Sequence, residues 1–186
     1  MTDRANPAPL GLMGFGMTTV LLNIHNAGFF PMDVMILAMG IFYGGLAQVI
    51  AGIMEFRKNN TFGLTAFTSY GLFWMTLVFI IIFKGDGVFN GDTGFMGWYL
   101  FMWGLFTAYM FVGTLKKNRA LQTVFGSLTI LFLLLAVRDW TGNTGWLADL
   151  AGWEGIFTGF SAIYLAAAEV LEDSFGRKLL PIGEVE

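Results

Sequence analysis

The chain has 186 residues, of which 56% are hydrophobic and 12% are charged, and its formal net charge is −3. Soluble domains carry about 25% charged residues, so this composition and a mean hydropathy of +0.67 leave no room for a soluble domain. The absence of cysteine excludes disulfides and thiolate metal sites.

We therefore expect one integral membrane domain over residues 1–186, all-α and polytopic. A helix that crosses the hydrocarbon core needs about 20 mostly apolar residues, and long apolar runs disfavour a β-barrel. The segment before the first run lacks a signal-peptide pattern, so we treat it as part of the mature chain. Six stretches fit a six-helix bundle: 8–29, 32–56, 61–83, 95–115, 120–137 and 150–171.

The first stretch carries its polar residues on one face. At about 100° per residue, Thr18, Thr19 and Asn26 fall on the same side as Phe15, and Met17 falls opposite. Polar side chains within a membrane usually face the bundle interior or a wet cavity. This face is therefore either a set of interhelical hydrogen bonds or the wall of a pore.

Three later stretches carry similar polar stripes. Hydrogen bonding between helices is the simpler interpretation of any one of them, whereas stripes on four helices together favour a pore in each protomer. Hydroxyl and amide groups without a central Lys or Arg suit small carboxylates or other small polar solutes that must leave again. The candidate lining residues are Gln48 in the second stretch, Thr65 and Ser69 in the third, and Gln122 and Thr129 in the fifth.

Asn6 and Pro7 predict where the first helix begins. Asn6 is a favourable N-cap and Pro7 suits the first helical turn. The positive end of that helix would face the cytoplasmic mouth, where a carboxylate could rest. Ordinary helix capping is the alternative role for Asn6.

The basic residues predict the orientation in the membrane. Cytoplasmic loops are enriched in Lys and Arg, so this distribution places both termini in the cytoplasm. One side carries Arg4, Arg57, Lys58, Lys116, Lys117, Arg119, Arg177 and Lys178, and the other carries Lys84 and Arg138.

Two ionisable residues are candidates for coupling to protons. His25, the single histidine, lies near the outer end of the first stretch and either relays protons or binds a neighbouring loop. Glu169 lies about a turn from the cytoplasmic end of the last stretch, and an intramembrane carboxylate is a functional candidate.

An enzyme is not expected. The chain has no G-x-S-x-G or H-E-x-x-H motif, no cysteine and one histidine, so it lacks the groups for a nucleophile–base pair or a metal set. We accordingly expect no cofactor, no metal site and no nucleic-acid partner.

The segments "NPAPLGLMGFGMTT", "HNAGFF", "MGIFYGGLAQ", "NTFGLTAFTSYGLFW", "GTLKKNRALQ" and "FGRKLLPIGE" resemble the acetate uptake transporter family, the bacterial and archaeal succinate–acetate permeases. The resemblance covers nearly the whole chain, and NPAPLGL is the signature of the family. It implies a six-helix protomer with its own pore, a ring of six protomers in the plasma membrane, and passage of acetate and succinate together with protons.

The resemblance also implies which residues form the narrowest point. It places Phe15 in "MGFGM", Tyr70 in "TSYG" and Leu128 in "GSLTILF" at a constriction, and Ala162 in "FSAIY" at a position that bears on substrate size. The helical face of the first stretch independently selects Phe15. The residues alone leave Tyr70 as an aromatic side chain packed on glycine. The segment "RDWTGNTGWLADL" departs from bacterial relatives in its charge and tryptophans, which affects the outer entry.

Two questions stay open at the level of sequence. Proton-coupled symport and channel-like permeation both need a wet polar path, and coupling also needs a proton site linked to a gate. A channel for formate, nitrite or a neutral amide would have a similar cation-poor lining.

Overall fold

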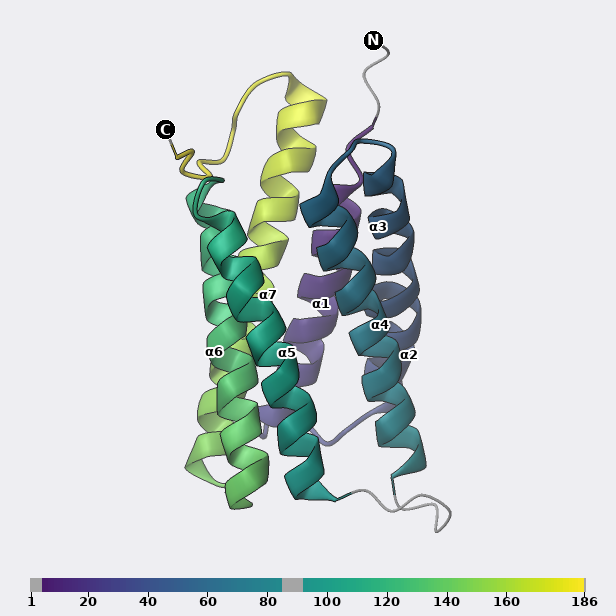
Figure 1. Cartoon of the computed structure of the whole chain (residues 1–186), viewed down its shortest axis with the longest axis vertical. Helices are drawn as coiled ribbons and strands as arrows, with labels where there is room; N and C mark the ends of the chain where they lie inside the picture. The colour runs from purple at the N-terminus through teal and green to yellow at the C-terminus, as the bar shows by residue number, and fades with distance from the viewer. Residues whose placement is uncertain (1–4, 85–91, 186) are drawn as a thin grey trace.

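A computed structural model describes residues 5–84 and 92–185, and Figure 1 shows them as a bundle of long helices. Arg4 and most of the loop "KGDGVFNGDTG" lie outside the described residues. Both described ends of the chain lie at the same end of the bundle. The elements are α1 (Ala8–Asn26), α2 (Val34–Ile41), η1 (Phe42–Ala47), α3 (Gln48–Phe56), α4 (Thr61–Phe83), α5 (Thr93–Thr114), α6 (Arg119–Thr141) and α7 (Trp146–Phe175).

The helices are long and apolar enough for a membrane. In the described residues, five segments qualify by length and hydropathy, with α2, η1 and α3 forming one of them over Val34–Phe56. α1 runs beside these segments, but its glycines and polar residues lower its hydropathy. The prediction of an all-α, polytopic membrane protein is confirmed.

The second membrane-spanning segment, Val34–Phe56, contains a π-helix that its sequence did not predict. The π-helix η1 interrupts the expected helix over 32–56, with Gly44 and Gly45 buried in it. A Cβ atom on Gly44 would lie 2.9 Å from Thr18 Oγ1, and one on Gly45 would lie 2.7 Å from the Gly40 carbonyl oxygen. The π-helix therefore occurs where the segment packs closely against α1. Apolar periodicity does not reveal this change from α-helical to π-helical hydrogen bonding.

The last two helices, α6 and α7, are longer than expected. α6 extends over 119–141 and α7 over 146–175, whereas apolar stretches over 120–137 and 150–171 were expected. Apolar composition indicates the part within lipid, and helical hydrogen bonds continue past it into polar residues at the bundle ends.

The start of α1 corrects one prediction. The N-cap is Pro7 rather than Asn6. The proline in the first helical turn is therefore Pro9 rather than Pro7. Asn6 Oδ1 instead accepts hydrogen bonds from the Ala8 backbone N–H at 3.3 Å and from Lys58 Nζ at 2.9 Å. Asn6 therefore links α1 to the end of α3.

α1 lies directly against α7 because both helices carry glycine at their contact. A Cβ atom on Gly16 would lie 2.7 Å from the Gly159 carbonyl oxygen, and one on Gly155 would lie 2.1 Å from Asn23 Cγ. Small residues let helix backbones approach in this way. α5 packs mainly along α6, and α4 along α3 and η1, whereas the α4 and α5 backbones barely meet. Side chains therefore span the space between α4 and α5.

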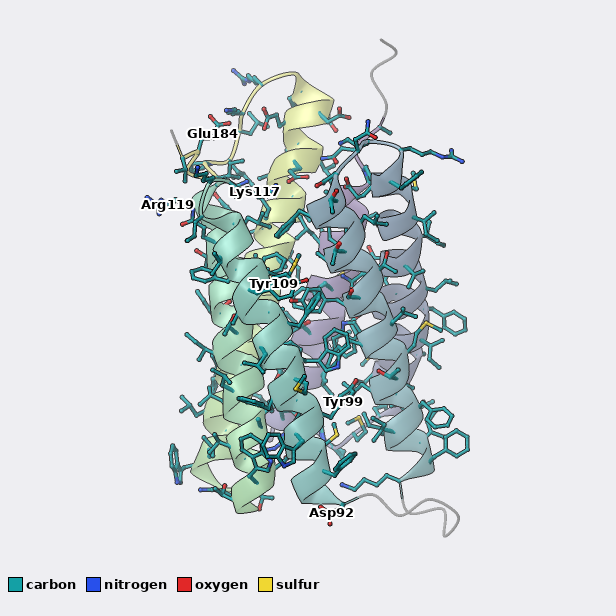
Figure 2. The ribbon with its side chains drawn as sticks, in the orientation of Figure 1. Asp92, Tyr99, Tyr109, Lys117, Arg119 and Glu184 are labelled. Carbon is teal, nitrogen blue, oxygen red and sulfur yellow. The ribbon has the colours of Figure 1, made fainter. Side chains whose placement is uncertain are left out.

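The chain after α7 returns to the start of α6. Gly176, in the left-handed region with φ 64°, ends α7. The Gly183 and Ile182 carbonyl oxygens accept from the Arg119 and Ala120 N–H groups at 2.7 and 2.9 Å. Figure 2 shows Lys117, Arg119 and Glu184 gathered at this end. We call residues 176–185 the C-terminal tail.

Candidate functional site

Two cavities enter the bundle from opposite ends. One, of about 660 Å³, lies at the end away from the chain termini, and we call it the distal cavity. The other, of about 570 Å³, lies beside the starts of α1, α4 and α6, and we call it the proximal cavity. Each cavity draws its walls from both α4 and α6, so the two occupy the same interhelical space from its two ends.

The distal cavity has a polar mouth. His25 and Asn26 line the mouth from α1, and Arg138 and Asp139 line it from α6 as an ion pair with Nε and Oδ1 2.7 Å apart. Thr19, which is 2% exposed, lines the cavity deeper, one turn of α1 from Phe15. His25 Nδ1 lies 2.9 Å from the Phe30 carbonyl oxygen, which can only accept, so Nδ1 carries the proton. In neutral His25 the Nε2 atom is therefore an acceptor, and protonation turns it into a donor.

The proximal cavity is bordered by cations and by helix starts. Lys116 and Lys117 line it, and the Lys117 ammonium lies 4.8 Å from the centre of the Phe62 ring. Asn60 and Asn118, which cap α4 and α6, also line it. The positive ends of these helices favour negative charge at this end of the bundle.

One chain of hydrogen bonds crosses the rim of the proximal cavity. Asn6 Nδ2 donates to Glu169 Oε2 at 2.8 Å, and Lys58 Nζ donates to Asn6 Oδ1 at 2.9 Å. Asn6 and Glu169 both line the cavity. The amide of Asn6 thereby connects an ammonium group on one side with a carboxylate on the other.

Aromatic and aliphatic side chains separate the two cavities. Phe15 and Leu128 are the lining residues of α1 and α6 farthest from the distal mouth. The Tyr70 ring centre lies 5.9 Å from that of Phe15 and 6.1 Å from that of Phe125, which lines the proximal cavity. We call Phe15, Tyr70 and Leu128 the waist. Its three members are at most 5% exposed, and Ala162, which is fully buried, belongs to the same apolar cluster.

Several residues around the waist were not singled out from the sequence. Trp103, Phe106 and Thr107 of α5 contact Tyr70, and Thr107 Oγ1 lies 2.8 Å from the Tyr70 hydroxyl oxygen. The signal that was available is a single threonine within the aromatic run "WYLFMWGLFTAY".

Two of the expected lining residues are instead buried where α1 packs against η1 and α3. Thr18 Oγ1 donates to the Met39 carbonyl oxygen at 3.5 Å, and its side chain packs on Gly44. Gln48 is 1% exposed and lies close to Gly14. Neither residue is among those that line the two cavities.

The expected lining residues of α4 and α6 also lie outside the two cavities. Thr65 and Ser69 are half-buried. Gln122 Nε2 donates to the Thr114 and Leu115 carbonyl oxygens at 3.3 and 3.2 Å, which satisfies the end of α5. Thr129 Oγ1 donates to the Phe125 carbonyl oxygen of its own helix at 2.8 Å. In the described part of the chain, no three His, Asp or Glu side chains are placed to hold a metal ion.

Three comparisons relate the chain to known proteins. Residues 1–178 match the GPR1/FUN34/yaaH family. The chain is 60% identical to the succinate-acetate/proton symporter SatP of Escherichia coli (strain K12), covering 98% of this chain and 97% of that protein. It is 36% identical to acetate permease A of Emericella nidulans, covering 96% of this chain and 65% of that protein. A solved structure of the bacterial acetate channel SatP superposes with a TM-score of 0.94 at 59% identity, covering 97% of this chain and all of that one.

Proposed function

Because the chain belongs to the GPR1/FUN34/yaaH family, we propose that it carries small carboxylates, chiefly acetate and also succinate, across a membrane. One observation supports this function most directly: two cavities enter the bundle from opposite ends and end on the two sides of one apolar waist. A solute path needs this arrangement, and a purely structural bundle does not.

The chemistry of the proximal cavity suits an anion. Lys116 and Lys117 supply positive charge, Glu169 and Glu184 line the same cavity as carboxylates, and the starts of α1, α4 and α6 add dipoles whose positive ends face this end of the bundle. The charges lie at the mouth rather than at the waist, so a carboxylate is attracted without being trapped. Asn6 provides a neutral donor at the rim.

The waist suits a small solute with one polar end. Phe15, Tyr70 and Leu128 form an apolar collar, and a hydrophobic constriction gates by steric closure and by excluding water. The methyl end of acetate fits such a collar. Succinate must bring a second carboxyl group through it, which costs free energy when that group is unpaired.

The polar mouth of the distal cavity provides the other entry. Thr19 and Asn26 offer neutral hydrogen-bonding groups, and His25 adds a donor at Nε2 when protonated. The path thus runs from Asn26 and Thr19, through the waist, to Asn6 at the proximal rim.

The path is open to two modes of transport, channel-like permeation and proton symport, and Glu169 is the proposed proton-linked residue for symport. Its carboxylate lines the proximal cavity and accepts from Asn6, so its protonation would change the hydrogen bonding at that rim. In symport, Glu169→Gln should lower acetate accumulation driven by a pH gradient to the level of protein-free liposomes, while protein-mediated acetate exchange at equal pH continues. Labelled acetate in proteoliposomes measures both, and unchanged accumulation would exclude this role for Glu169.

The same preparation tests the function itself. Proteoliposomes containing the purified protein should take up labelled acetate faster than protein-free liposomes, and excess acetate or succinate should compete better than formate or urea. Formate or urea competing best would favour the other solutes that the lining admits. Uptake equal to that of protein-free liposomes would contradict a transport function.

We further propose that the protomer forms a ring of six in the plasma membrane, with both termini in the cytoplasm. Large apolar side chains are more than half exposed on several helices, among them Phe42, Ile53, Phe79 and Phe157. Lipid and neighbouring protomers would cover them. The described ends of the chain lie at the same end of the bundle, where Asn6 contacts Lys58 and the Val185 N–H donates to the Lys117 carbonyl oxygen, which agrees with cytoplasmic termini.

A further inference from the structure

The hydrogen bond between Tyr70 and Thr107 has a fixed direction. Thr107 Oγ1 donates to the Trp103 carbonyl oxygen at 2.7 Å, which uses the single proton of the threonine hydroxyl. The Tyr70 hydroxyl, 2.8 Å from Thr107 Oγ1, must therefore be the donor and Thr107 the acceptor. The polar end of the Tyr70 side chain is thus held on α5.

The surroundings make this acceptor important for Tyr70. Tyr70 is 3% exposed and Thr107 is fully buried. The Tyr70 ring is enclosed by the rings of Phe15, Trp103, Phe106 and Phe125, with centres 5.4 to 6.1 Å away. A phenol hydroxyl that lost its acceptor among these rings would remain unpaired unless the ring moved until the hydroxyl reached water.

We propose that Thr107 is a positioning residue that sets the size limit of the solute path through Tyr70. The proposal rests on the transport function and on the waist inferred above. Thr107 does not touch the solute. It keeps the Tyr70 hydroxyl directed to α5, so that the ring rather than the hydroxyl faces the solute path at the waist. Without this acceptor, the hydroxyl turns toward water in a cavity, and the ring then obstructs larger solutes more than acetate.

A second threonine–tyrosine hydrogen bond joins α4 to α5 and provides a control. It distinguishes the positioning of Tyr70 from a general role in holding the two helices together. Thr76 Oγ1 donates to the Phe73 carbonyl oxygen at 2.9 Å and lies 2.8 Å from the Tyr99 hydroxyl oxygen, which also donates to the Phe73 carbonyl oxygen at 3.4 Å. It joins the same two helices through the same pair of residue types, but Tyr99 borders the distal cavity rather than the waist. Figure 2 shows Tyr99 in the half of α5 that leads to Asp92.

The test compares succinate with acetate uptake into proteoliposomes for matched variants. Thr107→Val removes the acceptor at nearly constant volume and should lower the succinate-to-acetate flux ratio by about fivefold, the effect of one unmade buried hydrogen bond. Thr107→Ser keeps the acceptor and should keep the wild-type ratio. Thr76→Val should also keep it, because Tyr70 is untouched.

A second variant decides between positioning and packing. Thr107→Val combined with Tyr70→Phe removes both partners, so no hydroxyl needs an acceptor, and the flux ratio should return toward that of Tyr70→Phe alone. An unchanged ratio in Thr107→Val, an equal change in Thr76→Val, or no recovery in the double variant would each overturn the proposal. Wild-type protein that fails to transport acetate would instead overturn the transport function on which the proposal rests.

Discussion

At the scale of single residues, the polar face of α1 was predicted, but the burial of Thr18 at one edge of that face was not. Phe15, Thr19 and Asn26 line the distal cavity, whereas Thr18 is buried against Gly44 of η1. A wheel of about 100° per residue orders side chains around a helix axis but does not say which neighbour each edge meets. The position of η1 decides that, and it depends on packing rather than on periodicity.

Tyr70 and Leu128 show what the family resemblance added. The sequence pattern left Tyr70 as an aromatic side chain packed on glycine, and only the resemblance placed it near Phe15. The ring contacts with Phe15 and Phe125 now put it between the cavities. Thr107 was not predicted, because a single threonine in an aromatic run carries no periodic signal.

Ala162 gives a prediction at this scale. It is fully buried within the apolar cluster that contains the waist, so a larger side chain there must displace its neighbours. Ala162→Phe should reduce acetate uptake into proteoliposomes at least about tenfold, because overpacking moves side chains into the path. Ala162→Gly is the control, and it should keep uptake within twofold. If a correctly assembled Ala162→Phe variant took up acetate at the wild-type rate, position 162 would not affect the solute path.

At the scale of elements, the lengths of the apolar segments predicted the membrane-spanning helices well. They did not predict the local helix geometry within those segments. The rod over 61–83 was expected with the bounds that α4 has. The π-helix η1 was not expected, because it shifts the hydrogen bonding of a segment whose composition stays apolar throughout. Thr65 and Ser69 on α4 line neither cavity and are half-buried, because a polar stripe does not specify which neighbouring helix it meets.

The C-terminal tail gives a prediction for α6. The first N–H groups of a helix have no partner within the helix, and here Gly183 and Ile182 accept from Arg119 and Ala120. Removal of residues 179–186 should raise amide hydrogen exchange at Arg119 and Ala120 by roughly tenfold or more. Amides in the middle of α1 should not change and serve as the control. Unchanged exchange at Arg119 would mean that the tail does not stabilise this helix start.

At the scale of the whole molecule, the bundle divides into two groups of helices. One runs from α1 to α4 and the other from α5 to α7, and they meet chiefly where α7 packs on α1. The cavities and the waist lie where α4, α5 and α6 face α1 across the middle of the bundle. Composition and spacing predicted the membrane class and the fold. They did not predict where the path runs, because that depends on which helices pack closely and which stay apart.

The assembly and its orientation can be tested together. Native mass spectrometry in mild detergent should give the mass of six protomers, since the exposed apolar side chains need cover. A tag at either terminus should react with an impermeant label only after the cells are opened. A monomer mass would contradict the ring, and labelling of a terminus on intact cells would contradict the orientation.

The central claim is that solutes pass the waist formed by Phe15, Tyr70 and Leu128, and the selectivity of Leu128→Ala tests it most directly. This substitution shortens one side of the apolar collar, so the second carboxyl group of succinate needs less dehydration to pass. The succinate-to-acetate flux ratio in proteoliposomes should rise by about fivefold or more. A wild-type ratio, measured on protein with unchanged abundance and assembly, would show that Leu128 only packs the core and would contradict the waist.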